Sequence, residues 1–183
     1  HRLISRNTKK KFNSTIVIPH GIQNHSESKK NYSFKKNYSK PIKCLYVSPI
    51  WVFKNQWNVV KAVAKLREKG FNINLKLIGS LKDNSYKLLE NELNLSDPKR
   101  EFVEVLGHLK HDQLDIHYKS SDIFIFASSC ESFGITLLEA MSYGLPIACS
   151  KLSSMPETLR NSGVYFNPDN YFSIMQAIKN LII

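Results

Sequence analysis

Two carboxylates and a glycine lying close together form the part of this sequence that is best suited to chemistry. Glu131 and Glu139 are separated by seven residues, and Gly134 lies between them. They follow the apolar run 123–127, which is typical of a strand buried on both faces. A helix that starts near Gly134 would present its first backbone N–H groups and its positive dipole end to an anion. Because carboxylates accept hydrogen bonds from hydroxyl groups, the pattern favours a ligand with both phosphate and hydroxyl groups, such as a sugar nucleotide.

The same residues also have a purely structural interpretation. Glu131 could be a loop carboxylate that favours the start of the helix, and Glu139 a solvated helix residue. Glu139 lies four residues after Ile135, and therefore one turn further along the same helix face. Because Glu is a good helix former and common on helices, spacing alone favours this structural interpretation.

Several motifs in a fixed order give the sequence a resemblance to a known enzyme family. Glu131 and Glu139, followed by Ala140-Met141 and 144–146, resemble the E-x7-E segment of retaining glycosyltransferases of family 4, which have the GT-B fold. The resemblance extends over nearly the whole chain and includes residues 17–22, 45–54, 105–109, 121–126, 156–157 and 166–169. It implies the C-terminal, donor-binding domain of an enzyme that transfers a sugar from a nucleoside diphosphate (UDP or GDP) to a glycan or lipid-linked acceptor. Such enzymes build lipopolysaccharide, capsule and other surface polysaccharides.

The resemblance also implies residue roles. Glu139 would accept hydrogen bonds from ribose hydroxyls, and Glu131 would face the donor sugar at the reacting centre. Lys54 would pair with the diphosphate and stabilise the transition state as the sugar–phosphate bond breaks. Further donor-binding positions are the backbone of Phe133, Gly134, Ile135 and Thr136 for phosphate, and Gly79, Gly107, His108 and Leu109 beside the nucleoside. Glycine at 134 is expected because a side chain there could block the close approach of phosphate.

One position departs from the family pattern. The family commonly has an arginine five residues before the lysine, and this chain has Pro49 there. Diphosphate binding would then depend more on the backbone at 133–136. Without the resemblance, Lys54 would be read as a solvated lysine before a helix. His108 fits a loop histidine that packs or lines the base pocket better than it fits a general base.

No metal cofactor is expected. The sequence has no Asp-x-Asp and no His, Cys and Asp cluster with metal-ligand spacing. The expected ligand is the nucleoside-diphosphate sugar itself, as donor substrate. Retention of anomeric configuration, by front-face attack with the diphosphate assisting deprotonation of the acceptor, is implied by the resemblance alone.

Strands and helices alternate along most of the chain, which predicts an α/β fold. We expect a Rossmann-like, doubly wound parallel sheet with helices on both faces, the C-terminal half of a GT-B fold. Strands are expected at 42–47, 73–78, 102–106, 123–127, 147–150 and 164–166. Helices are expected at 56–69, 84–93, 111–120, 134–141, from Pro156, and after a cap at Asp169 or Asn170. Since ligands bind at the carboxyl ends of such strands, the loops 48–55, 79–81, 107–109 and 128–134 should converge.

Charge divides the chain of 183 residues unevenly. Residues 1–43 contain eleven Lys and Arg against one acid, a net charge of +10, whereas residues 44–183 contain fifteen against fourteen, a net charge of +1. We therefore predict a basic leader and linker at 1–43, with a short strand at 15–18 that ends a missing N-terminal domain. The nucleotide-sugar-binding domain would occupy residues 44–183.

The leader and the three cysteines bear on location. The leader could contact anionic lipid headgroups or polyanions, although a solvated linker is the simpler interpretation. We expect a cytoplasmic protein, with peripheral contact to the inner membrane face as an option, and no nucleic-acid partner. Cys44, Cys130 and Cys149 lack paired spacing and are expected to be buried, reduced residues.

Two other functions remain open from the sequence. The first is a non-catalytic nucleotide-binding module on the same fold, and the second is a basic polyanion-binding protein. If the main hypothesis is right, the N-terminal acceptor domain is not in this chain. The chain alone should then bind a nucleotide or nucleotide sugar and transfer little or no sugar. The base, sugar, acceptor, linkage and oligomeric state stay undetermined.

Overall fold

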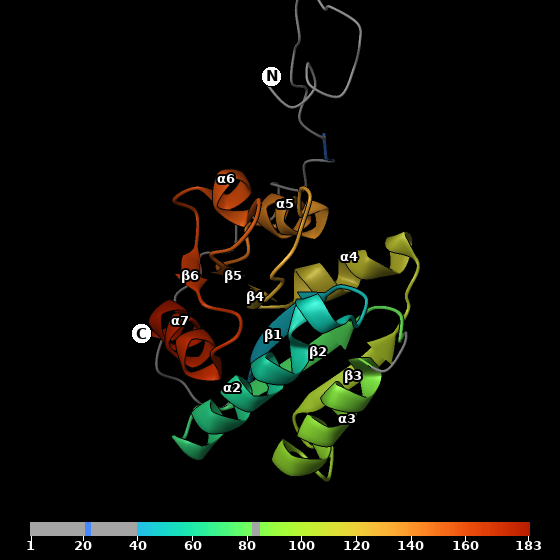
Figure 1. The fold of residues 1–183 in the computed structure, drawn as a ribbon, viewed down its shortest axis with the longest axis vertical. Coiled ribbons are helices and arrows are strands. Elements are labelled where there is room, and N and C mark those ends of the chain that lie inside the picture. The colour runs from blue at the N-terminus through green and yellow to red at the C-terminus, as the bar shows by residue number, and fades with distance from the viewer. Residues whose placement is uncertain (1–20, 23–39, 82–84) are drawn as a thin grey trace, which may run out of the picture.

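A fully parallel, six-stranded sheet is the centre of the computed structural model, which describes residues 21–22, 40–81 and 85–183 (Figure 1). Its strands are β1 (Ile42–Val47), β2 (Ile73–Ile78), β3 (Val103–Gly107), β4 (Ile123–Phe126), β5 (Ile147–Ser150) and β6 (Val164–Phe166). They are ordered β3-β2-β1-β4-β5-β6. The chain thus builds outward from β1 to β3 and then returns to place β4 on the other side of β1. The predicted doubly wound α/β class is confirmed.

Helices follow each strand and cover both faces of the sheet. They are the short 3₁₀ helix η1 (Val52–Lys54), α2 (Gln56–Glu68), α3 (Ser85–Ser96), α4 (His111–Ser120), α5 (Ile135–Ser142), α6 (Met155–Leu159) and α7 (Tyr171–Ile182). Asn170 caps α7, because its side-chain oxygen accepts from the backbone N–H of Phe172 at 2.9 Å. Of the two caps that the sequence allowed, the structure selects this one.

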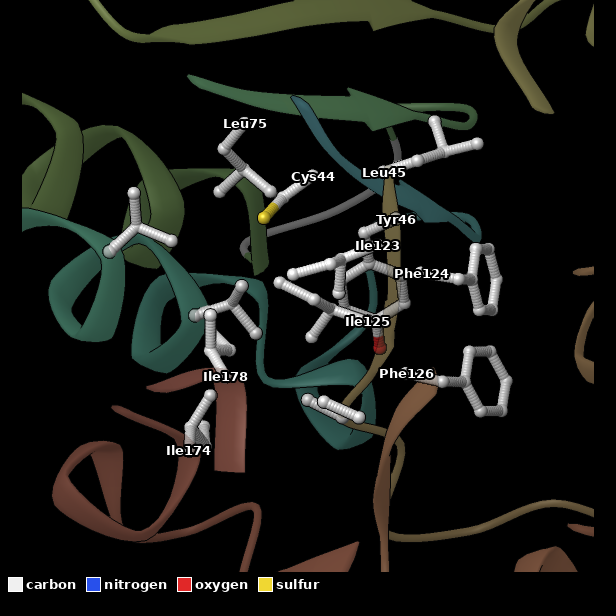
Figure 2. Close-up of a cluster of buried hydrophobic side chains, with 14 of the residues drawn as sticks. Cys44, Leu45, Tyr46, Leu75, Ile123, Phe124, Ile125, Phe126, Ile174 and Ile178 are labelled. Carbon is white, nitrogen blue, oxygen red and sulfur yellow. The ribbon is translucent and has the colours of Figure 1, made fainter. Parts of the chain in front are cut away.

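The apolar run of β4 is buried on both faces, as predicted. Figure 2 shows Ile123 and Ile125 on the side of the sheet that faces α2 and α7, and Phe124 and Phe126 on the opposite side. On that second side the ring of Phe124 lies 5.9 Å from the ring of Tyr118 in α4. Full burial of such side chains stabilises the fold by about 1.5–3 kcal/mol each.

Strand register brings the exit loops to one level. Val47 pairs with Ile78, so β1 and β2 end together. Beyond them the N–H of Ile50 donates to Ser80 O at 3.0 Å, and the N–H of Gly79 donates to Gly107 O at 2.7 Å. The convergence of loops at the carboxyl edge is confirmed here.

Several element boundaries differ from the prediction by a few residues. Strand β3 runs to Gly107 because Gly107 pairs with Ile78 after a register shift in β2. Helix α3 continues to Ser96, since the buried Asp97 accepts backbone N–H groups of residues 101–103 and turns the chain there. Strand β4 ends at Phe126, and α6 begins one residue before Pro156.

The leader lies mostly outside the described residues. The predicted strand at 15–18 falls there, and the division at residue 43 stays a prediction, with β1 beginning at Ile42. Within the described ranges, no helix has the length and apolar character needed to cross a bilayer.

Candidate functional site

Lys54 and Glu131 form a buried ion pair at the switch point of the sheet, between β1 and β4, where the order in which the chain adds strands reverses. Lys54 ends η1 after β1, Glu131 follows β4, and these two strands are neighbours although the chain leaves β1 toward β2. Their side chains are 7% and 16% exposed. In doubly wound sheets this crevice is where ligands bind. A solvated Lys54 is therefore the wrong interpretation.

Aromatic rings surround the ammonium group. Lys54 Nζ lies 5.2 Å from the ring centroid of Phe53 and 5.4 Å from that of Phe126. The backbone carbonyl of Lys54 accepts from the Tyr46 hydroxyl at 2.6 Å. A buried cation needs a countercharge, and Glu131 supplies it where water has little access.

A single asparagine ties η1 to the loop after β4. Asn55 has a left-handed backbone, with φ 54°, and its Nδ2 donates to Ala127 O and Ser129 Oγ, each at 3.0 Å. The N–H of Ser129 donates to Phe53 O at 2.7 Å. These bonds fix the two halves of the ion pair relative to each other. Sequence reasoning missed Asn55, although asparagine is enriched in this conformation.

Hydroxyl groups near α6 hold the carboxylate loop from its other side. Ser153 Oγ donates to Glu131 O at 2.6 Å and accepts from the Glu131 N–H at 3.1 Å. Thr158 Oγ1 donates to Phe133 O at 2.9 Å. These side chains lie 22 to 25 residues after the loop, so no local pattern could have identified them.

Gly134 caps α5 in a left-handed conformation, with φ 77° and ψ 54°. A Cβ there would lie 3.8 Å from Leu137 Cβ and 3.9 Å from Phe126 Cε1, which are ordinary contacts. The backbone angle therefore requires glycine here, whether or not a ligand approaches. Helix α5 follows β4, so its first N–H groups lie at the carboxyl edge of the sheet. That Phe133, Gly134, Ile135 and Thr136 hold phosphate stays a prediction.

Glu139 lies on the side of α5 that faces α4. Its side chain is 17% exposed. Its Oε2 accepts from the Tyr118 hydroxyl at 2.8 Å, and its Oε1 lies 3.8 Å from His111 Nδ1. Burial, and then the adjacent Glu139 charge, raise the pKa of Tyr118 far above its usual range, so its hydroxyl stays a donor. The interpretation of Glu139 as an ordinary solvated residue is wrong.

A pocket of 280 Å³ opens beside Glu139 between α4 and α5. Ile135, His111 and Tyr118 line it together with Glu139, and Gly21 and Ile22 from the segment before β1 also reach it. Lys54 and Glu131 lie outside this lining. The structure therefore places the two carboxylates of the motif in different surroundings, one against a cation and one beside an open pocket with a tyrosine donor.

The four residues that are predicted to border the nucleoside lie at the carboxyl edge of the sheet. Gly79 and Gly107 are hydrogen-bonded to each other, His108 is exposed and Leu109 is half-buried before α4 begins at His111. At position 49, where the family commonly has arginine, the Pro49 carbonyl accepts from Gln56 Nε2 at 3.0 Å. His111 is a site residue that the sequence did not identify.

The expectation of three buried cysteines is partly wrong. Cys44 and Cys149 are buried in strands, and burial raises the pKa of both thiols well above the usual range. Cys130 is exposed, because the loop before Glu131 runs over the surface at the carboxyl edge. Across residues 40–81 and 85–183, no group of three His, Cys, Asp or Glu side chains gathers in a metal-binding arrangement. The absence of a metal requirement stays a prediction.

Comparison with known proteins identifies the family. Residues 28–183 match the model of the family described as glycosyl transferases group 1, so the chain belongs to that family. It is 27% identical over 147 residues to the O-antigen chain mannosyltransferase RfbU of Salmonella typhimurium, covering 80% of this chain and 39% of the relative. It is 33% identical over 77 residues to O-antigen chain mannosyltransferase B of Escherichia coli, covering 42% and 20%.

Solved structures share the fold. The lipopolysaccharide outer core galactosyltransferase WaaB aligns with a TM-score of 0.70 at 20% identity, covering 99% of this chain and 49% of that one. Anabaena HepE, solved with UDP and glucose, aligns with a TM-score of 0.70 at 19% identity, covering 80% and 40%. The chain thus spans less than half the length of each of these proteins.

Proposed function

We propose that this glycosyltransferase group 1 domain is the donor-binding half of a retaining, family 4 enzyme that uses a nucleoside-diphosphate sugar. The observation that carries the proposal is the buried Lys54–Glu131 pair at the switch point of the sheet, beside the first turn of α5. A structural neighbour, Anabaena HepE, was solved with UDP and glucose, and two relatives are named O-antigen chain mannosyltransferases.

Lys54 supplies positive charge for the diphosphate. As the bond between the anomeric carbon and the phosphate oxygen breaks, negative charge develops on that oxygen, and a preorganised ammonium stabilises it. The Phe53 and Phe126 rings keep the surroundings of Lys54 poorly solvated, which strengthens the attraction. With Pro49 in place of arginine, the remaining phosphate contacts come from the backbone N–H groups of 133–136.

Glu131 orients the donor sugar. Its carboxylate accepts hydrogen bonds from sugar hydroxyls, while its backbone is fixed by Ser153. The acceptor hydroxyl attacks the anomeric carbon on the face from which the diphosphate leaves, and its proton passes to the departing phosphate oxygen. The new glycosidic bond then has the configuration of the donor.

Glu139 binds the ribose. Its position on α5, one helical turn after Ile135 and beside the pocket between α4 and α5, places a hydrogen-bond acceptor away from the phosphate end. Gly79, Gly107, His108 and Leu109 border the nucleoside, with main-chain groups reading the base. No metal ion takes part in this arrangement.

The complete enzyme would also contain an N-terminal domain that binds a glycan or lipid-linked acceptor. The names of the relatives support a role in surface polysaccharide synthesis, and we place this synthesis at the cytoplasmic membrane face. The basic segment 1–43 would serve as a linker with the option of peripheral membrane contact. Without the acceptor domain, the 183-residue chain should bind the donor and transfer little or no sugar.

Calorimetric titration of the chain with UDP, GDP and ADP, and with their sugar conjugates, tests donor binding. We expect selective binding of one nucleotide, and Glu139→Ala should weaken it strongly. Glu90→Gln is the control, because Glu90 is an exposed helix carboxylate in α3. Binding of none of these nucleotides, or equal loss in both variants, would contradict the proposal.

A second experiment separates an enzyme from a non-catalytic module. Glu131→Ala in the full-length protein should reduce the transfer rate far more than the loss of folded protein explains, although it also costs about 3–5 kcal/mol of stability because it leaves Lys54 without its countercharge. If the unchanged full-length protein binds the nucleotide but transfers no sugar to any acceptor, the module interpretation is correct.

A further inference from the structure

Two stacked tyrosines connect α4 to α5 through reciprocal hydrogen bonds. Tyr118 of α4 donates to Glu139 of α5 at 2.8 Å, and Tyr143 at the end of α5 donates to Asp115 of α4 at 2.8 Å. The two rings lie 5.0 Å apart with an interplanar angle of 4°. Each helix thus contributes one phenol and one carboxylate to the contact. Asp115 and Tyr143 line the pocket together with Glu139, but only Glu139 has a role in the proposed donor site.

We propose that Tyr118 is a positioning residue that fixes the Glu139 carboxylate for the ribose hydroxyls of the nucleotide. The inference rests on the proposed function and adds a residue that acts through Glu139. It follows from how the two carboxylate oxygens are used. Oε2 accepts from Tyr118, whereas Oε1 lies toward His111, which also lines the pocket.

Tyr118 is well suited to hold a carboxylate still. Its side chain is 2% exposed, between the rings of Tyr143 and Phe124. A glutamate on a helix surface normally samples several rotamers, and ordering it opposes ligand binding. Because the phenol bond selects one orientation before the ligand arrives, that ordering is complete in the free protein.

The other neighbour of Glu139 is less suited to this role. His111 is 84% exposed, and its Nδ1 lies 3.8 Å from Oε1, which is beyond hydrogen-bond distance. Among the contacts that the structure describes for Glu139, the phenol bond is the short one made by a buried group. The orientation of the carboxylate therefore depends chiefly on Tyr118.

The test is Tyr118→Phe, with Tyr143→Phe as the matched control. Both changes remove one phenol oxygen from the same stacked pair, but only the first removes a bond to Glu139. Affinities of the chain are measured by calorimetry for UDP, GDP and ADP and for their 2′,3′-dideoxy counterparts. The dideoxy ligands keep the base and the diphosphate and lack both ribose hydroxyls.

We expect Tyr118→Phe to weaken binding of the preferred ribonucleotide about tenfold, the effect of one hydrogen bond to a charged group. The dideoxy affinity should stay unchanged, and Tyr143→Phe should leave both affinities unchanged. Equal weakening of ribo- and dideoxy ligands by Tyr118→Phe would mean a structural role and would overturn the inference. No weakening at all would also overturn it.

A second background guards against loss of folding in the single variant. In a Glu139→Ala chain, adding Tyr118→Phe should change the residual affinity for ribonucleotide and dideoxynucleotide by less than about twofold, because the bond is already gone. A further large loss would show that Tyr118 acts by another route. Equal binding of both ligand sets by the unaltered chain would show that Glu139 does not bind the ribose hydroxyls. Binding of neither set would contradict the proposed function. Either outcome would overturn the inference about Tyr118.

Discussion

Removing the charge of Lys54 should separate what the ion pair between β1 and β4 contributes to stability from what it contributes to donor binding. The perturbation is Lys54→Met, which keeps the length and apolar stem of the side chain. The Glu131 carboxylate, which is 16% exposed, then has no countercharge. Breaking a buried pair in this way costs about 3–5 kcal/mol, and the remaining exposure of Glu131 favours the lower end, about 3 kcal/mol.

The double variant Lys54→Met with Glu131→Gln removes both charges. Replacing a buried ion pair by neutral groups of similar size is often close to neutral, so we expect a cost of about 1 kcal/mol or less. The two variants therefore differ by about 2 kcal/mol, with the double variant the more stable of the two. Both should lose donor binding, because both lack the ammonium that pairs with the diphosphate.

Urea unfolding, followed by circular dichroism, measures these differences. With a slope of about 2 kcal/mol per molar urea, Lys54→Met should lower the midpoint by about 1.5 M and the double variant by about 0.5 M. The control is Lys76→Met, which breaks the exposed pair with Glu104 between β2 and β3 and should cost no more than about 0.5 kcal/mol. Calorimetry with the preferred nucleotide supplies the functional comparison.

A midpoint shift in Lys54→Met no larger than that in Lys76→Met would contradict a large cost for the unpaired Glu131 carboxylate. A double variant less stable than the single variant would contradict it as well, since the unpaired Glu131 carboxylate would then cost less than the glutamine that replaces it. Donor binding that survives in Lys54→Met would instead place the diphosphate elsewhere and remove Lys54 from the proposed mechanism.

Three further predictions concern the surroundings of the site. Gly79→Ala should lower the unfolding free energy by about 3 kcal/mol, because a Cβ would clash with the backbone oxygen of Ser48 in the loop after β1. The control is Gly70→Ala, where a Cβ would meet nothing within 4 Å and the left-handed backbone alone should cost about 1 kcal/mol. Equal melting temperatures of the Gly79→Ala and Gly70→Ala variants would contradict this prediction. Thr158→Val should cost about 1 kcal/mol and weaken nucleotide binding, because it frees the carboxylate loop; unchanged affinity would show that the loop is held without it. An aromatic disulfide at about pH 8 should react quickly with Cys130 alone, because burial raises the pKa of the other two thiols and their thiolates do not form; three fast thiols per folded chain would refute the burial.

The sequence by itself determined the order of strands and helices. Hydrophobic pattern predicted each strand to within one residue at either end, because a strand buried on both faces must be a continuous apolar run, as in 123–126. Turn and cap residues, such as Gly134 and Asn170, marked where helices begin. The two carboxylates and the lysine were also visible, since they belong to a motif with fixed spacing.

The tertiary structure decided what those charged residues contact. Lys54 and Glu131 are 77 residues apart, and their pairing depends on β4 lying beside β1, a neighbour relation that no local pattern specifies. Tyr118 and Glu139 meet because α4 and α5 pack on the same face of the sheet. Local periodicity encodes which face of an element is apolar, whereas the partners across elements follow from chain topology and packing. The sequence could therefore predict the ingredients of the site, and the fold alone determined which of them touch.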